Sequence, residues 1–176
     1  MGQDDQGVRS GRRRFQAIPR VLVFLRNGHD VLLLKGAPDK RIWANKFNGV
    51  GGHVEADEDV LCAARREVAE ETGLVVEALE LAAVVNINAG DLDTGILMFV
   101  FAGWSESRDT LASHEGELHW IPIDHLPKDE LVEDLEWLLP RVLTGWQGGR
   151  PRFLHYSYDA NDELVIQSAD VSQRDD

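Results

Sequence analysis

The chain has little cysteine, few basic residues and no long apolar run. It contains one cysteine in 176 residues, so no intramolecular disulfide forms and nothing calls for an oxidising compartment. No stretch approaches the roughly 18 to 20 apolar residues that a membrane-spanning helix needs, and no apolar segment of signal length opens the chain. We therefore expect a cytoplasmic protein that has no membrane partner.

The shortage of basic residues limits the classes of partner. Lys and Arg number 18 against 31 Asp and Glu, which gives a formal net charge of −13. This sign argues against binding through polymer phosphates, so we expect no nucleic-acid polymer as a partner. A small phosphate ligand is compatible with the charge, because a divalent metal held by carboxylates neutralises both sides of the contact.

The composition, 43% hydrophobic and 28% charged, is typical of one compact domain. Residues 1–15 show no hydrophobic period and are interpreted as a flexible N-terminal tail. The domain is expected over residues 16–160, and a polar C-terminal tail over 161–176, in which Leu164–Ile166 is only weakly strand-like. Monomer and homodimer both remain open.

Apolar runs between turn residues predict a mixed sheet with helices on its faces, which is an α/β fold. A hairpin turn at Asn27–Asp30 joins the first two strands. Helices are predicted over residues 58–72, with Asp57 as the N-cap and Gly73 as the stop, and over 131–143. The predicted strands are Val21–Leu25, Val31–Leu34, Ala82–Ile87, Ile96–Phe101, Leu118–Ile123 and Arg152–Tyr158.

Three glutamates of the first helix share one side. On a helical wheel, Glu67, Glu70 and Glu71 fall within a sector of about 100° at the margin of the apolar stripe. Like charges so close together raise the free energy of the fold unless a cation lies among them. A set of oxygen ligands suits Mg²⁺, with Mn²⁺ as the alternative.

Glutamate-rich helices are usually solvated, but the surroundings of this helix favour a site. A glycine-rich turn at residues 49–52 precedes the helix and lets the backbone approach a ligand closely. Arg66 lies beside Glu70 on the wheel and can hold it by a charge-assisted hydrogen bond. Cys62, which follows Leu61 in the same helix, is interpreted as a core residue.

This segment resembles the Nudix box, G-x5-E-x7-R-E-U-x-E-E-x-G-U, in which U is aliphatic. The resemblance implies a Nudix α/β/α sandwich and Mg²⁺-dependent hydrolysis of a nucleoside diphosphate linked to another group. Carried over by position, Glu67, Glu70 and Glu71 are metal ligands, Arg66 orients them, and Glu58 supports the helix or the metal. The matching positions are Gly52, Glu58, Arg66, Glu67, Val68, Glu70, Glu71, Gly73 and Leu74.

Two more stretches resemble the MutT-homologue branch, which hydrolyses oxidised purine nucleoside triphosphates such as 8-oxo-dGTP. Residues 47–54 are similar to its W-N-G-x-G-G-K-V stretch, and residues 131–134 to its W-P-D-D stretch. By this resemblance Asn48 hydrogen-bonds the purine, and Glu133 and Asp134 read the base edge. An equally weighted alternative makes the two acids first-turn residues favoured by a helix dipole. The implied substrate-binding residues are Phe47, Asn48, Gly51, Gly52, Glu133 and Asp134.

The sequence departs from the branch at its aromatic positions. Phe47 and Leu131 stand where the branch has tryptophans. Loss of an aromatic platform removes stacking of roughly 1 to 3 kcal/mol per base. Selectivity for an oxidised purine is therefore less firmly supported than hydrolysis itself.

The general base has two candidates outside the box. Glu115 falls where the branch has an acid that reaches the metal, and Glu117 competes for that role. The expected catalytic set is thus Glu70, Glu71, Arg66 and Glu115, and a box glutamate remains an alternative base.

We expect a pyrophosphohydrolase that converts a purine nucleoside triphosphate, in one reading an oxidised one, to the monophosphate and pyrophosphate. Two alternatives stay open. The substrate can instead be another nucleoside diphosphate derivative, namely an NDP-sugar, ADP-ribose or a dinucleoside polyphosphate. The domain can also be a Nudix module that senses a nucleotide without cleaving it.

Overall fold

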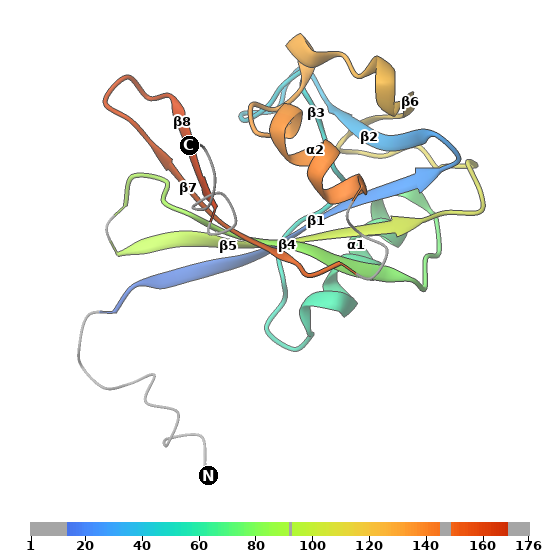
Figure 1. Cartoon of the computed structure of the whole chain (residues 1–176). Coiled ribbons are helices and arrows are strands. Elements are labelled where there is room, and N and C mark those ends of the chain that lie inside the picture. The colour runs from blue at the N-terminus through green and yellow to red at the C-terminus, as the bar shows by residue number, and fades with distance from the viewer. Residues whose placement is uncertain (1–13, 92, 145–148, 169–176) are drawn as a thin grey trace.

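The computed structural model describes residues 14–91, 93–144 and 149–168, and in these ranges it forms a mixed sheet flanked by two helices (Figure 1). None of the helices in these ranges is long and apolar enough to cross a membrane. The strands are β1 Gln16–Asn27, β2 Asp30–Gly36, β3 Phe47–Asn48, β4 Leu79–Ile87, β5 Thr94–Trp104, β6 Gly116–Pro122, β7 Arg152–Tyr158 and β8 Leu164–Ser168. The helices are α1 Val60–Thr72 and α2 Leu135–Thr144, and two 3₁₀ turns span Ile123–His125 and Lys128–Glu130.

The strands β1 and β2 separate along part of their length, and the candidate active site lies where they separate. Its strand order is β3-β2-β1-β5-β4-β7-β8, and β6 pairs with the other edge of β2. β1 pairs with β2 only beside their turn, from Leu25↔Leu32 to Asn27↔Asp30. Beyond this point β2 pairs with β3, and the glycine-rich segment lies against β1 through the bridges Val23↔Val50 and Arg20↔His53. The expected hairpin and α/β class are confirmed.

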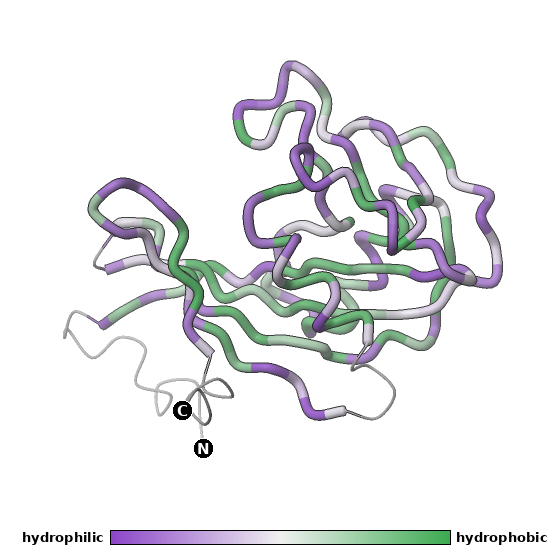
Figure 2. Tube along the Cα trace, turned by 45° about the horizontal axis from the view of Figure 1, so that its top comes forward, coloured by the Kyte–Doolittle hydropathy of each residue, from purple (hydrophilic) through white to green (hydrophobic). Residues whose placement is uncertain are grey.

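Alternating residues of β1 supply two separate cores. Val21, Val23 and Leu25 pack in the cluster that includes the buried face of α1. Leu22 and Phe24 pack in the cluster that includes α2. The two helices accordingly lie on opposite sides of the sheet (Figure 1), and hydrophobic residues concentrate along its central strands (Figure 2). This arrangement is the sandwich expected from the resemblance.

The caps of α1 differ in part from the prediction. The N-cap is Asp59, whose carboxylate accepts hydrogen bonds from the backbone N–H groups of Leu61 at 2.8 Å and Cys62 at 3.0 Å, so the assignment of the cap to Asp57 is wrong. Gly73 ends the helix in the left-handed conformation with φ 73°, as predicted. Cys62 is exposed rather than buried, because Ala63 and Ala64, not Cys62, face the sheet.

Two other boundaries also change. Residues 131–132 are extended rather than helical, since Leu131 bridges Phe47 and the Val132 N–H donates to the Phe47 carbonyl at 3.0 Å. β8 pairs with β7 inside the predicted C-terminal tail, because Val165 and Ile166 supply a last antiparallel strand. Residues 1–13 and 169–176, which make up most of the predicted tails, lie outside the described residues.

Candidate active site

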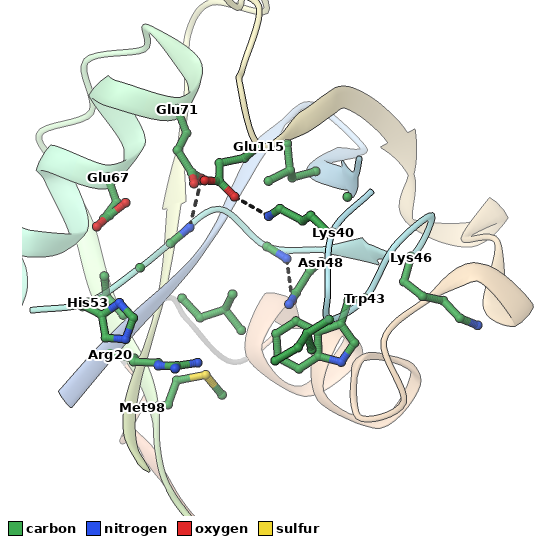
Figure 3. Close-up of a pocket in the computed structure, with 18 of the residues that line it drawn as sticks. Arg20, Lys40, Trp43, Lys46, Asn48, His53, Glu67, Glu71, Met98 and Glu115 are labelled. Atoms are coloured by element: carbon green, nitrogen blue, oxygen red, sulfur yellow. Dashed lines mark hydrogen bonds and ion pairs between the residues drawn. The ribbon is translucent and has the colours of Figure 1, made fainter. Parts of the chain in front are cut away.

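A cleft of about 580 Å³ opens where β1 and β2 part (Figure 3). Its walls come from β1, the loop at residues 37–46, the glycine-rich segment and α1. The lining side chains with polar or aromatic groups are Arg20, Lys40, Arg41, Trp43, Lys46, Asn48, His53, Glu55, Glu67, Glu71 and Glu115. Some residues of the box and some of the residues implied in substrate binding therefore line one cavity.

Arg66 holds the glutamates of α1 together. Its Nε and Nη2 donate to both oxygens of Glu58, at 3.2 and 2.7 Å. Its Nη1 donates to Glu67 at 2.9 Å and to Glu70 at 3.1 Å, and Nη2 also reaches the His53 carbonyl at 3.0 Å. One guanidinium thus ties α1 to the segment before it, and the Arg66–Glu70 bond expected from the wheel is present.

Glu67 and Glu71 line the cleft from α1, and Glu115 meets them from the loop before β6. The Gly51 N–H donates to Glu71 at 3.2 Å, and a Cβ on Gly52 would collide with the Glu67 carboxylate. At Gly52 the backbone therefore approaches Glu67 as closely as only glycine permits.

The environment of Glu71 disfavours its charged form. Burial, and then the charges of Glu67 and Glu115, raise the pKa of Glu71 to about 7, although the Gly51 hydrogen bond and the charge of Lys40 oppose the rise. A cation among these carboxylates would offset the repulsion between their negative charges. This end of the cleft therefore fits a hard divalent ion by its chemistry.

Glu70 and Glu58 lie outside the cleft lining. The Glu70 side chain is 61% exposed and is bonded to Arg66, and Glu58 is engaged with Arg66 through both oxygens. In the described part of the chain, no three carboxylate, imidazole or thiolate groups lie close enough to hold a metal as they stand. A box-based metal set therefore needs the Glu70 side chain to rotate away from Arg66.

The structure separates the two candidates for general base. Glu115 lines the cleft, accepts a backbone hydrogen bond from Ala37 at 3.1 Å and forms an ion pair with Lys40. Glu117 does not line the cleft, and its side chain is 83% exposed beside His119. Only Glu115 faces Glu71.

The residues implied in base recognition are only partly brought together. Asn48 lines the cleft, and its Oδ1 accepts a hydrogen bond from the Gly49 N–H at 2.8 Å (Figure 3), so its amide NH₂ can donate to a ligand. Phe47 is buried against His119 and lies outside the lining. Glu133 is exposed and Asp134 is buried, and neither lines the cleft.

Asp134 lies among apolar residues at the start of α2. Burial is the main cause that raises its pKa to about 6; the charge of Glu133 adds to the rise, and the Tyr156 hydroxyl opposes it. The burial of Asp134 and the exposure of Glu133 show that two adjacent acids of the sequence have different surroundings.

Sequence reasoning missed the loop at residues 37–46. This loop contributes Lys40, Arg41, Trp43 and Lys46 to the cleft. Its sequence has mixed charge and no hydrophobic period, so it indicates a loop and no particular role. The signal that was available is the gathering of three cations and an aromatic ring directly before the glycine-rich turn. Arg20 was missed because it precedes the apolar run of its strand.

The chain matches the family model of the NUDIX domain over residues 17–142. It belongs to the Nudix family. The family membership expected from the box is confirmed, and the chain is a Nudix hydrolase. A zebrafish (Danio rerio) protein named oxidized purine nucleoside triphosphate hydrolase is 30% identical over 142 residues, which cover 78% of this chain and 86% of that protein. A Mus musculus protein of the same name is 25% identical over 137 residues, which cover 77% of this chain and 85% of that protein.

Solved structures of Nudix proteins share the fold. The crystal structure of a MutT protein from Bacillus halodurans superposes with a TM-score of 0.72 at 23% identity, and the match covers 87% of this chain and 98% of that one. The Nudix domain of Shewanella oneidensis NrtR, crystallised with ADP ribose, gives a TM-score of 0.62 at 15% identity, with 82% of this chain and 98% of that chain covered. At these identities the likeness concerns the fold alone.

Proposed function

We propose that this Nudix hydrolase is a Mg²⁺-dependent pyrophosphohydrolase that converts a purine nucleoside triphosphate to the monophosphate and pyrophosphate. The observation that carries the proposal is one cleft in which Glu67, Glu71 and Glu115 converge and Asn48 presents an amide. The names of the zebrafish and mouse relatives support oxidised purines such as 8-oxo-dGTP as members of the substrate class.

The metal would be held by Glu67 and Glu71 from the cleft and by Glu70 once its side chain has rotated away from Arg66, with Glu58 supporting them through Arg66. When bound, a divalent ion neutralises phosphate oxygens and lowers the pKa of water. Arg66 keeps α1 and the glycine-rich segment in register, so its role is positioning. Catalysis of phosphoanhydride hydrolysis then rests on positioning and electrostatics and needs no covalent enzyme intermediate.

We assign the general base to Glu115. It lines the cleft beside Glu71 and forms an ion pair with Lys40. An ionised carboxylate in this place can take the proton of the attacking water. Lys40, Arg41 and Lys46 from the neighbouring loop supply positive charge for the phosphate chain.

The substrate assignment is tested with a panel of dGTP, 8-oxo-dGTP, dATP, ADP-ribose and a dinucleoside polyphosphate, each assayed with Mg²⁺. We expect equimolar monophosphate and pyrophosphate from the purine triphosphates, with Asn48→Ala raising KM. Equal or faster turnover of ADP-ribose would refute the triphosphate assignment. Saturable nucleotide binding with no product from any compound would instead indicate a sensing module.

The catalytic assignment is tested with Glu71→Gln, Glu70→Gln and Glu115→Gln against the matched control Glu117→Gln. We expect the three variants to lose at least about a hundredfold in kcat, the usual contribution of a general base or charge-stabilising group. The control variant should keep wild-type kcat. Full activity of Glu115→Gln combined with a loss in Glu117→Gln would reverse the assignment of the base.

A further inference from the structure

Trp43 is a large aromatic residue that lines the cleft and remains half exposed. Its exposed fraction is 50%, and Figure 3 shows its indole beside the Asn48 side chain. Within the ranges that the structure describes, the indole has no aromatic, cation–π or hydrogen-bond partner. A ring of this size, accessible from a cavity, offers a flat apolar surface to a ligand.

The backbone holds Trp43 in this place at a conformational cost. Its φ of 60° lies in the left-handed region, which is unfavourable for a bulky residue. Hydrogen bonds from Lys46 N to the Trp43 carbonyl, at 3.1 Å, and from Asn45 N to the Gly36 carbonyl, at 3.0 Å, enforce the turn. Gly36 lies so close that a Cβ there would meet the Trp43 oxygen at 2.6 Å. The tight turn thus fixes the backbone from which the indole projects.

The stacking residue of the MutT-homologue branch is absent from this chain. Leu131, at the corresponding position, is aliphatic and only 4% exposed, within the core below α2. Phe47 is buried as well. Of the Phe, Tyr and Trp side chains that the structure describes, Trp43 alone lines the cleft.

We propose that Trp43 is the stacking platform for the nucleobase of the substrate. The proposal deepens the proposed function and rests on it for the class of ligand. Asn48 would meet the edge of the base while Trp43 covers its face. Stacking accepts any base, so Trp43 sets affinity for the nucleoside part and leaves the choice between purines to edge contacts.

Binding of dGMP, dAMP and inorganic tripolyphosphate to Trp43→Ala and Trp43→Phe tests the proposal. We expect Trp43→Ala to bind both nucleotides about 5- to 150-fold more weakly. Trp43→Phe should keep most of the affinity, because it retains a ring. Tripolyphosphate, which has no base, should bind both variants as it binds the wild type. Unchanged nucleotide affinity in Trp43→Ala, or an equal loss for tripolyphosphate, would overturn the proposal.

Tryptophan fluorescence supplies a readout that does not depend on turnover. We expect dGMP to quench wild-type emission, and the quenching to disappear in Trp43→Phe. The matched control is Trp104→Phe, since Trp104 is 42% exposed at the end of β5 and does not line the cleft. Quenching that persists in Trp43→Phe and disappears in Trp104→Phe would refute the assignment.

Two outcomes separate this proposal from others. Ile42, also 50% exposed, lies next to Trp43, so the pair can be a protein contact instead. A change of molar mass with concentration that Trp43→Ala abolishes, together with unchanged dGMP affinity, would establish that contact and overturn the stacking role. If the wild type binds dGMP through Trp43 but hydrolyses no nucleotide in the panel, the proposed function fails and the stacking assignment stands.

Discussion

Replacing the buried carboxylate of Asp134 by an amide should stabilise the protein at neutral and alkaline pH. The Asp134 residue is 8% exposed, and burial is the first cause of the rise of its pKa from 3.8 to about 6. At about 1.36 kcal/mol per pKa unit, the ionised side chain lowers the free energy of unfolding at pH 8 by up to ~3 kcal/mol. Asp134→Asn removes this penalty and nearly preserves volume, so we expect a gain of about 2 to 3 kcal/mol.

The sign follows from proton binding in the two states. The folded protein holds the Asp134 proton up to about pH 6, whereas the unfolded chain releases it near 3.8. The stabilising contribution of this group is therefore complete below about pH 3.8 and is lost as the pH rises to 6. The difference between Asp134→Asn and the wild type should shrink to less than about 1 kcal/mol at pH 4.

Urea unfolding at pH 4 and pH 8, without divalent metal, measures the effect. The control is Glu133→Gln at the exposed neighbouring acid, for which we expect a change within about 0.5 kcal/mol. A variant Asp134→Asn that is no more stable than the wild type at pH 8, or that gains equally at both pH values, would refute the reasoning. The same variant assayed on dGTP tests base reading, since a rise in KM would show that Asp134 contacts the substrate despite its burial.

Three further perturbations test the site and helix α1. Arg66→Lys keeps the charge but loses the planar fork that binds Glu58. Unfolding in urea should show a free energy of unfolding lower by about 1 to 3 kcal/mol, and kcat should be at least about tenfold lower. Wild-type stability would contradict this interpretation of Arg66. Mg²⁺ should raise the wild-type Tm by binding the folded state, and Glu71→Gln should weaken this increase markedly, as differential scanning fluorimetry would show; an equal increase in both proteins would remove Glu71 from the metal set. Cys62 is exposed, so a thiol reagent should modify the native protein, and modification only after unfolding would disprove the exposure. A hydrogen bond with Asp59 is the main cause that raises the pKa of the Cys62 thiol, so Asp59→Asn should speed the reaction.

The parts of the fold that the sequence could predict are those specified within one short segment. Helix α1 combines a local acid cap, a regular apolar stripe and a terminal glycine, so it was located within two residues at its start and ended where predicted. The residual error arose because Asp57 and Asp59 have the same capping chemistry, so the pattern of residue types does not select between them. Cys62 was misplaced because a periodic pattern indicates the buried stripe but leaves its width open.

The substrate part of the cleft was less accessible to sequence reasoning. Trp43 and Arg20 line a cavity formed by segments far apart in the chain, so the patterns around each of them do not show that they meet there. Asp134 and Glu133 are adjacent and chemically alike, yet one is buried and the other exposed. Burial of this kind depends on how the start of α2 packs on the sheet, which a pattern of residue types does not specify.

The parallel pairing of β1 with β5 has a consequence for the order of folding. It joins Gln16 to Thr94 and Arg26 to Trp104, so a long loop that contains the whole Nudix box must close before the centre of the sheet exists. Such non-local pairing is slow relative to the formation of a capped helix. During synthesis the complete box is therefore made well before its cleft. We expect refolding monitored by far-UV circular dichroism to run ahead of recovered hydrolysis, with the delay set by strand pairing.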